Sequence, residues 1–254
     1  MKRAYIVMLL VAMMTTALKA QEFKVSKSSG KLNIVEVNNV KIEGYTGKEI
    51  TFTSSSYSND RDDRAKGLRA VSSLGLEDNT GLGLSVLEIN GVVEVRQLKK
   101  MDGPNVLIRV PQGINVTYSH SSPYGSDIEI KNVEGELDIS TVHNDVRLEN
   151  VSGPMKIRTV HGDIDATFTG LLKNEVFLSS THGHVDVAIP GDTKANLKLN
   201  TSWGEIFIDP AFKLELERSG DMVKYSDKMV AKINGGGITV NLSSTHDNIY
   251  LRKK

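Results

Sequence analysis

The sequence TVHNDV at residues 141–146 returns 18 positions later as TVHGDI at residues 159–164. It returns in altered form as STHGHV at residues 180–185 and as TSWGEI at residues 201–206, in two further steps of 21 positions. A second motif, NVEG at residues 132–135, returns as NVSG at residues 150–153, again 18 positions later. Fixed periods in this range are typical of solenoid proteins, in which each repeat adds one coil to a stack.

Apolar and polar residues alternate on both sides of each repeated turn, as in LDI at residues 137–139 and VRL at residues 146–148. This pattern predicts strands with one buried and one exposed face. Two short strands per repeat leave no room for a crossover helix, so equivalent strands should lie in parallel, about 4.8 Å apart. The predicted fold is all-β: a single-domain parallel β-solenoid (β-helix-like) with coils of about 18–21 residues.

The repeats divide the chain into predicted regions. Residues 21–118 should form irregular N-terminal coils, with a first coil near residues 23–56 and a charged insertion at residues 54–83 that contains one helical turn near residues 68–74. Residues 119–209 should form the regular repeats. Residues 210–254 should form a C-terminal hairpin, with its turn at SGD (residues 219–221), and a last coil. Corner glycines should occupy left-handed or crowded backbone, with Asn144 as a left-handed substitute.

The composition and the N-terminal segment indicate the cellular location of the protein and the partners to expect. The 254 residues include 31 basic and 31 acidic side chains and no cysteine, so we expect neither a nucleic acid nor an anionic membrane as partner. A basic start, an apolar run from Ala4 to Met14 and small residues to Ala20 resemble a secretory signal peptide. We place its end at residue 20, with Ala17 as the competing site. The mature protein, residues 21–254, should be exported by a bacterium to the periplasm, the outer surface or the medium, with no integral membrane segment.

Ring-bearing residues recur at one corner of the predicted coil. The aligned positions are Tyr124, His143, His161, His182, Trp203 and His246. Rings one coil apart can make favourable offset or tilted contacts. We therefore expect a structural ladder of His143, His161, His182, Trp203 and His246, with Tyr124 and Trp203 as candidate ligand-stacking groups.

Two metal sites are alternatives to purely structural or solvated roles for these side chains. His161, His182 and His184 could bind Zn²⁺ from neighbouring coils. The acidic run with Asp60, Asp62 and Asp63 could bind Ca²⁺, but it lacks the glycine and distal glutamate of an EF-hand loop. Solvated or structural roles are favoured for both sets, and no cofactor is expected.

An enzymatic alternative uses Asp145, Asp163 and Glu205, which recur two residues after the ring position. Acid–base catalysis on a glycan needs two carboxyl groups with different pKa values. Equivalent repeat positions should give similar surroundings, so corner capping and solvation are favoured. We expect the protein not to be an enzyme.

Several motifs together resemble a known family. Gly135-Glu136-Leu137, the repeats at residues 159–164 and 201–206, and DNTGLGL at residues 78–84 are similar to the DUF4097 "putative adhesin" β-strand-repeat family. The likeness extends from about Leu32 to about Asp209. It implies a β-solenoid exported to the bacterial envelope, and it supplies no catalytic residues.

The sequence therefore favours a non-enzymatic envelope protein that acts as an adhesin or scaffold. Its partner could be a glycan, the matrix or an envelope protein. The outward-facing candidates are Asp138, Lys156, Arg158, Asp165, Asp186 and Lys198. The alternatives are a glycan-active enzyme and a sensor of envelope stress that binds a partner protein. The ligand and the oligomeric state stay open.

Overall fold

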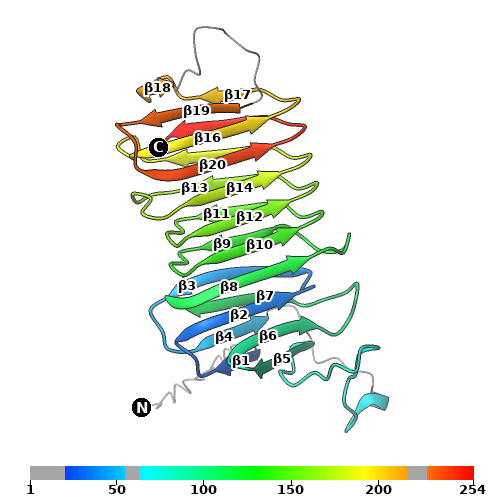
Figure 1. Ribbon diagram of the computed structural model, residues 1–254. Coiled ribbons are helices and arrows are strands. Elements are labelled where there is room, and N and C mark those ends of the chain that lie inside the picture. The colour runs from blue at the N-terminus through cyan, green and yellow to red at the C-terminus, as the bar shows by residue number, and fades with distance from the viewer. Residues whose placement is uncertain (1–20, 55–62, 217–227) are drawn as a thin grey trace, which may run out of the picture.

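The computed structural model describes residues 21–54, 63–216 and 228–254 (Figure 1). Within these ranges the chain is almost entirely β-structure, and the helical content is the single 3₁₀ turn η1 (Asp63–Ala65). The described residues contain no helix that is long and apolar enough to cross a bilayer. The predicted signal peptide, residues 1–20, lies outside the described residues.

The strands form two large sheets. Sheet A has ten strands in the spatial order β1 (Gln21–Val25), β4 (Ile50–Ser54), β7 (Asn105–Pro111), β3 (Asn39–Tyr45), β9 (Ile128–Lys131), β11 (Val146–Glu149), β13 (Ile164–Thr167), β15 (Val185–Ile189), β21 (Ile249–Lys253) and β17 (Ile206–Ile208). Sheet B has eleven, in the order β18 (Leu214–Leu216), β19 (Lys228–Ile233), β16 (Ala195–Thr201), β20 (Ile238–Ser244), β14 (Val176–Ser180), β12 (Met155–Thr159), β10 (Leu137–Thr141), β8 (Gly113–His120), β2 (Ser29–Val35), β6 (Val92–Gln97) and β5 (Leu84–Ile89).

Each central coil contributes one strand to each sheet, and equivalent strands pair in parallel. Thr141 of β10 lies beside Thr159 of β12, at the 18-residue offset of the sequence repeat. Thr159 in turn lies beside Ser180 of β14, at the 21-residue offset. The expected all-β architecture of stacked parallel strands is confirmed in this region.

Side-chain alternation places the core between the sheets. In β12 the burial alternates along the strand, with Met155, Ile157 and Thr159 buried and Lys156 exposed. Each coil adds such residues to one continuous apolar cluster that runs from Leu32 to Leu251. Burial of a large apolar side chain contributes about 1.5–3 kcal/mol, so each coil is stable mainly through its two neighbours.

The C-terminal coil enters the stack instead of extending it. β20 lies between β14 and β16, where Val240 is beside Val176 on one side and Leu197 on the other. β21 likewise lies between β15 and β17. The prediction that residues 201–206 stack directly on residues 180–185 is therefore wrong. Residues 244–249 read STHDNI and repeat the hydroxyl, ring and apolar positions of both neighbours, so they fit between them.

The N-terminal coil enters the stack in the same way. Leu32 of β2 lies between Val116 of β8 and Val93 of β6. Ile42 of β3 lies beside Ile108 of β7 and Ile130 of β9. Strands β2 and β3 of the predicted first coil are therefore internal and have partners on both sides, whereas β1 is the end strand of sheet A.

Antiparallel strands close most of the ends. At the N-terminal end β4 pairs antiparallel with β7, β1 with β4, and β5 with β6. At the other end β19 pairs antiparallel with β16, and β18 with β19. These strands cover edges that would otherwise be free to pair with another chain.

One predicted feature is absent from the structure, and two others lie outside the described residues. No helical turn forms over residues 68–74, where Leu68, Val71 and Leu74 are all exposed and therefore give a helix no buried face to pack. Asp60, Asp62 and the predicted turn at residues 219–221 lie outside the described residues.

Within the predicted insertion, Asp78 accepts hydrogen bonds from the N–H groups of Thr80, Gly81 and Gly83 and shapes the loop into β5.

Candidate functional site

The repeated motif forms the turn from sheet B to sheet A, called here the histidine corner. In spatial order its five copies are residues 142–145, 160–163, 181–184, 245–248 and 202–205. A buried hydroxyl precedes each copy, at Thr141, Thr159, Ser180, Ser244 and Thr201. The Ser180 hydroxyl donates to the Gly162 carbonyl at 2.9 Å and accepts from the Gly183 N–H at 2.9 Å. The hydroxyls of Ser244 and Thr201 likewise donate to a carbonyl of the neighbouring coil, whereas the Thr141 hydroxyl donates within its own corner. Three of the five hydroxyls thus join one coil to the next.

The corner glycines are required by crowding. A Cβ on Gly162 would lie 2.1 Å from the Asn144 carbonyl oxygen of the preceding coil, and one on Gly204 would lie 2.1 Å from the Asp247 carbonyl oxygen. Neither glycine has a positive φ, and the expected left-handed conformation of Asn144 is also not found. The preceding coil has a longer turn, residues 121–127. The side-chain amide of Asn144 donates to the Ser126 carbonyl of that turn at 2.8 Å. Left-handed asparagines occur instead at Asn132 and Asn150, at the opposite corner.

Five rings form one exposed column at the histidine corner. Their order is His143, His161, His182, His246 and Trp203, with centroid separations of 5.3, 4.8, 4.7 and 6.4 Å. The interplanar angles are between 5° and 13°. His246 separates His182 from Trp203 because the C-terminal coil is inserted there. Trp203, at the end of the column, is 77% exposed.

Tyr124 does not align with this column. Thr141 pairs with His120, and Val146 pairs with Ile128, so residues 121–127 replace a corner of four residues. The turn is three residues longer than its neighbour. By register the ring position in this coil is Ser122. Tyr124 lies in the enlarged turn, 38% exposed.

The last residue of three of the five corners caps the next coil. Asp145 Oδ1 accepts the Asp163 N–H at 2.9 Å, Asp163 Oδ1 accepts the His184 N–H at 2.9 Å, and Asn248 Oδ1 accepts the Glu205 N–H at 2.8 Å. These bonds satisfy backbone donors that the strands do not pair. Asp145 and Asp163 therefore have a structural use, as the capping interpretation predicted.

His184 lies apart from the ring column. Its Nδ1 is 3.1 Å from Asp163 Oδ1, and its Nε2 is 3.0 Å from Asp165 Oδ1. Burial lowers the pKa of His184, but the hydrogen bond to Asp165 and the charges of Asp163, Asp165 and Asp247 outweigh it, and the net effect raises the pKa above its ordinary value. The edge of its ring faces Tyr250 at 6.2 Å.

The alternative zinc site of His161, His182 and His184 is not assembled among the described residues. Rings one coil apart present their nitrogens at about the rung spacing of 4.8 Å, whereas two Zn–N bonds span at most about 4 Å. Among the described residues, the one group of three candidate metal ligands with atoms within 4.8 Å of one another is Asp163, His184 and Asp247. The sequence alignment missed Asp247 because it placed residues 244–249 at the end of the stack.

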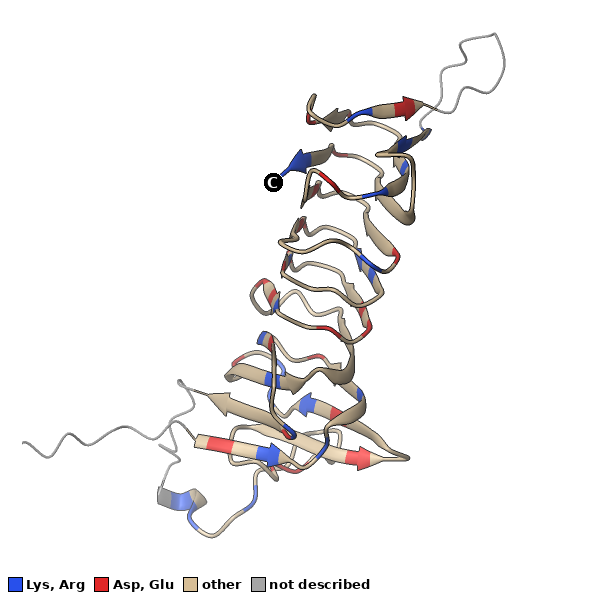
Figure 2. Ribbon diagram, turned by 90° about the vertical axis from the view of Figure 1, so that its left-hand side faces the viewer, with Lys and Arg blue, Asp and Glu red and all other residues tan. Residues whose placement is uncertain are grey.

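The predicted outward residues divide between the two sheet faces. Asp165 and Asp186 lie on sheet A, where Arg252 binds Asp186 at 2.7 Å. Further ion pairs on this face are Lys41–Glu129, Lys131–Glu149 and Arg147–Asp127, at 2.9–3.0 Å. Basic and acidic residues are interspersed along the stack (Figure 2). This face is therefore largely neutralised by its own pairs.

Sheet B presents two rows of side chains, one residue per rung. The central row is Asp138, Lys156, Phe177, Asn241 and Lys198. The hydroxyl row beside it is Ser140, Arg158, Ser179, Ser243 and Asn200. Lys156 and Lys198 are exposed, and no ion pair holds either within the described part of the chain.

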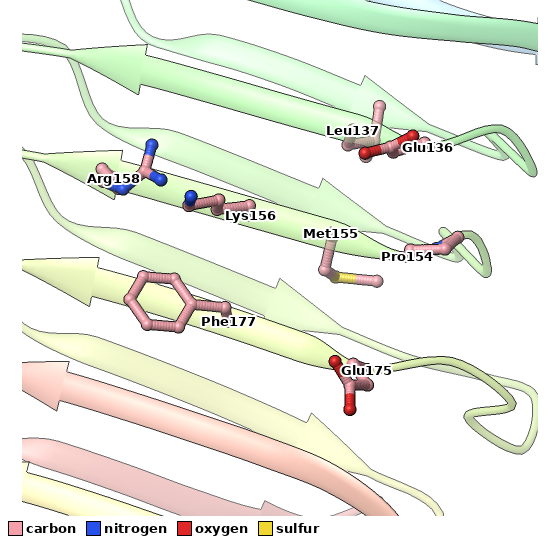
Figure 3. Close-up of a pocket in the computed structure, with 8 residues that line it drawn as sticks. All are labelled: Glu136, Leu137, Pro154, Met155, Lys156, Arg158, Glu175 and Phe177. Atoms are coloured by element: carbon pink, nitrogen blue, oxygen red, sulfur yellow. The ribbon is translucent and has the colours of Figure 1, made fainter.

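A shallow depression of about 520 Å³ lies across these rows (Figure 3). Its lining residues are Glu136, Leu137, Pro154, Met155, Lys156, Arg158, Glu175 and Phe177. Arg158 lies over the Phe177 ring, 5.9 Å from its centroid, and is 3.6 Å from Asp138. Sequence reasoning missed Phe177 because no other repeat carries an aromatic residue at that position.

The comparison with known families agrees with this geometry. A family model described as Toastrack DUF4097 matches residues 115–252, which is more than half of the chain. The chain belongs to the DUF4097 family. No curated protein matches this DUF4097 chain.

Three crystal structures of bacterial proteins are similar at low identity. A "putative cell adhesion protein" from Clostridium sporogenes has a TM-score of 0.45 and 15% identity, over 93% of this chain and all of that one. A "putative adhesin" from Bacteroides fragilis has a TM-score of 0.36 and 11% identity, over 94% and 98% of the two chains. A "putative adhesin" from Parabacteroides merdae has a TM-score of 0.26 and 10% identity, over 94% and 95%.

Proposed function

We propose that this DUF4097 protein is a non-enzymatic, exported adhesin or scaffold of the bacterial envelope, with residues 21–254 as one domain. Its binding surface is the sheet B face, formed by the central row and the hydroxyl row. The proposed ligand is an extended polysaccharide that carries acidic groups. The observation that carries this proposal is the central row itself, which places Phe177 next to Lys156 on one side and next to Asn241, followed by Lys198, on the other.

The chemistry of the two rows fits such a ligand. An aromatic ring offers an apolar surface to the C–H face of a sugar, and Arg158 keeps the Phe177 ring in place from one side. Serine and asparagine side chains in the hydroxyl row can donate to and accept from sugar hydroxyls. Lys156 and Lys198 supply positive charge that attracts carboxylate or sulfate groups. The sheet A face offers fewer such groups because its charges are paired.

A catalytic role is less well supported. Asp145 and Asp163 each accept a backbone N–H from the next coil. The sheet B depression is shallow, and a glycosidase needs two carboxyl groups on opposite sides of one bond. Glu136 and Glu175, at one edge of the depression, are separated by the β12 rung.

Binding can be tested with purified residues 21–254 and immobilised polygalacturonate, hyaluronan and neutral dextran. We expect binding to the acidic polymers, weakened at least tenfold by Phe177→Ala and by the double variant Lys156→Ala, Lys198→Ala. Arg147→Ala on sheet A is the matched control and should bind like the wild type. Equal binding to dextran, or equal loss in the control, would contradict the proposal. Release of reducing ends from any polymer would favour the enzymatic alternative.

Export is tested separately. Expression of the full chain in a bacterium, followed by fractionation and mass spectrometry, should give an envelope or secreted protein that begins at Gln21. A cytoplasmic protein that keeps residue 1 would contradict this part of the proposal without affecting the binding experiment.

A further inference from the structure

Three consecutive rungs bring one imidazole and two carboxylates together at the histidine corner. Asp163 precedes β13, His184 precedes β15, and Asp247 belongs to the inserted C-terminal coil. Their potential ligand atoms all lie within 4.8 Å of one another, and all three residues are half-buried. The insertion of the C-terminal coil next to β15 is what places Asp247 here.

The orientation of His184 is the second feature of the cluster. Nε2 is 3.0 Å from the Asp165 carboxylate, and Nδ1 faces Asp163 Oδ1 at 3.1 Å. A histidine that binds a metal through one ring nitrogen usually donates the other N–H to a carboxylate, which fixes the ring and its tautomer. When Nε2 carries that proton, Nδ1 and Asp163 Oδ1 are both acceptors, and a cation between them makes the contact favourable.

We propose that Asp163, His184 and Asp247 bind one divalent first-row transition-metal ion, of which Zn²⁺ is the representative. Asp165 acts as the positioning residue that orients His184. The Nδ1–Oδ1 separation of 3.1 Å is close to the separation of about 3.3 Å between two ligands of a tetrahedral ion with bonds of about 2.0–2.1 Å. The imidazole ligand favours zinc or a similar metal over Ca²⁺ and Mg²⁺. Water completes the coordination.

The surrounding charges favour this cation. Asp163, Asp165 and Asp247 place three carboxylates around one imidazole. On the same face, the guanidinium of Arg252 makes a bidentate pair with the carboxylate of Asp186. A bound ion would therefore reduce carboxylate repulsion and join the inserted coil to the coils of β13 and β15.

The exposed ring column requires a control, because surface imidazoles bind transition metals weakly by themselves. The experiment uses chelator-treated residues 21–254 and a calorimetric Zn²⁺ titration at neutral pH. A background variant, His161→Gln with His182→Gln, removes the two central rings of the column. We expect one Zn²⁺ per chain in both the wild type and the background variant.

Ligand variants are then made in the background variant. Asp247→Asn and His184→Asn should each lower Zn²⁺ affinity at least tenfold, and Asp165→Asn should lower it about 10–100-fold. Asn is structurally suitable at position 184 because Asn248 occupies the equivalent position on the next rung. Circular dichroism and the Tm in chelator should therefore match those of the background variant.

The outcomes separate the proposal from its alternatives. A rise in Tm with Zn²⁺ in the background variant, absent in Asp247→Asn, supports the site. Zn²⁺ binding that disappears with His161 and His182 would assign the metal to the ring column and overturn the proposal. Binding that Asp247→Asn leaves unchanged, or no binding at all, would show that the cluster is an ion-pair network only.

Discussion

Trp203 stacks on His246 with ring centroids 6.4 Å apart and an interplanar angle of 7°, although His182 is the nearer ring residue in the sequence. This contact exists because β20 and β21 lie between the coil of β14 and β15 and the coil of β16 and β17. The C-terminal segment is therefore an internal part of the stack, with apolar contacts on both sides.

The internal position of β20 predicts a large effect of truncating its core side chains. Leu242 is fully buried, so Leu242→Ala should lower the free energy of unfolding by about 2–5 kcal/mol. Leu216 of the edge strand β18 is 54% exposed, so Leu216→Ala should change it by less than about 0.5 kcal/mol. Urea unfolding followed by circular dichroism measures both. Equal effects would argue against the inserted coil.

Crowding at the corner predicts which glycines tolerate a methyl group. Gly162→Ala should lower the free energy of unfolding by about 2 kcal/mol or more, because its Cβ would overlap the Asn144 carbonyl. Gly170→Ala is the matched control, since a Cβ there meets nothing within 4 Å and its φ is not positive. Thermal unfolding of the two variants compares them. If Gly170→Ala destabilises the protein as much as Gly162→Ala, a change in chain flexibility, rather than crowding, explains the loss of stability.

The capping role of Asp145 can be separated from its charge. Asp145→Ala removes the acceptor for the Asp163 N–H and should lower the free energy of unfolding by about 1–2 kcal/mol. Asp145→Asn keeps a carbonyl acceptor and should change it by less than about 0.5 kcal/mol. Chemical unfolding of both variants is the measurement. If Asn is as costly as Ala, the carboxylate charge matters more than the hydrogen bond.

Rings at the centre of the column should contribute more to the stability of the protein than the ring at its end. His182 contacts the rings of His161 and His246, whereas His143 contacts one ring, that of His161. His182→Ala should therefore lower the free energy of unfolding by about 1–2 kcal/mol, and His143→Ala by about half as much. Unfolding in chelator, which removes any metal, measures the difference. Two equal losses would show that the stacking contributes little.

His120 predicts a dependence of stability on pH. Burial lowers the pKa of its imidazole, although the charge of Glu36 opposes this. Its folded-state pKa is thus below the value of about 6.5 in the unfolded chain, so the unfolded state takes up the proton first. The stability is complete above that value and decreases as the pH falls below it.

The variant His120→Gln tests this dependence. Glutamine keeps an amide near the Asn38 side chain, which His120 Nε2 contacts at 3.1 Å. Between pH 7.5 and pH 5 the free energy of unfolding should fall less steeply in this variant than in the wild type. Parallel curves would mean that His120 titrates equally in the folded and unfolded states.

The strand register, the buried faces and most ring positions could be predicted from the sequence alone. The 18-residue offset between Thr141 and Thr159 became the strand register itself, because a stacked coil needs the same residue type at the same place on each rung. The alternation in β12 correctly gave its buried face, and five of the six ring positions were correctly assigned to one corner.

Only the tertiary structure decided which rungs are neighbours. Residues 238–253 and residues 29–45 carry the same pattern as the coils around them, so the pattern cannot say between which two coils they lie. That choice separates His182 from Trp203 and brings Asp247 to His184. The longer turn that displaces Tyr124 and the pairing of Arg158 with Phe177 depend likewise on contacts between coils. The repeat determines which side chains each coil carries, and the packing of the coils determines which of these side chains are in contact.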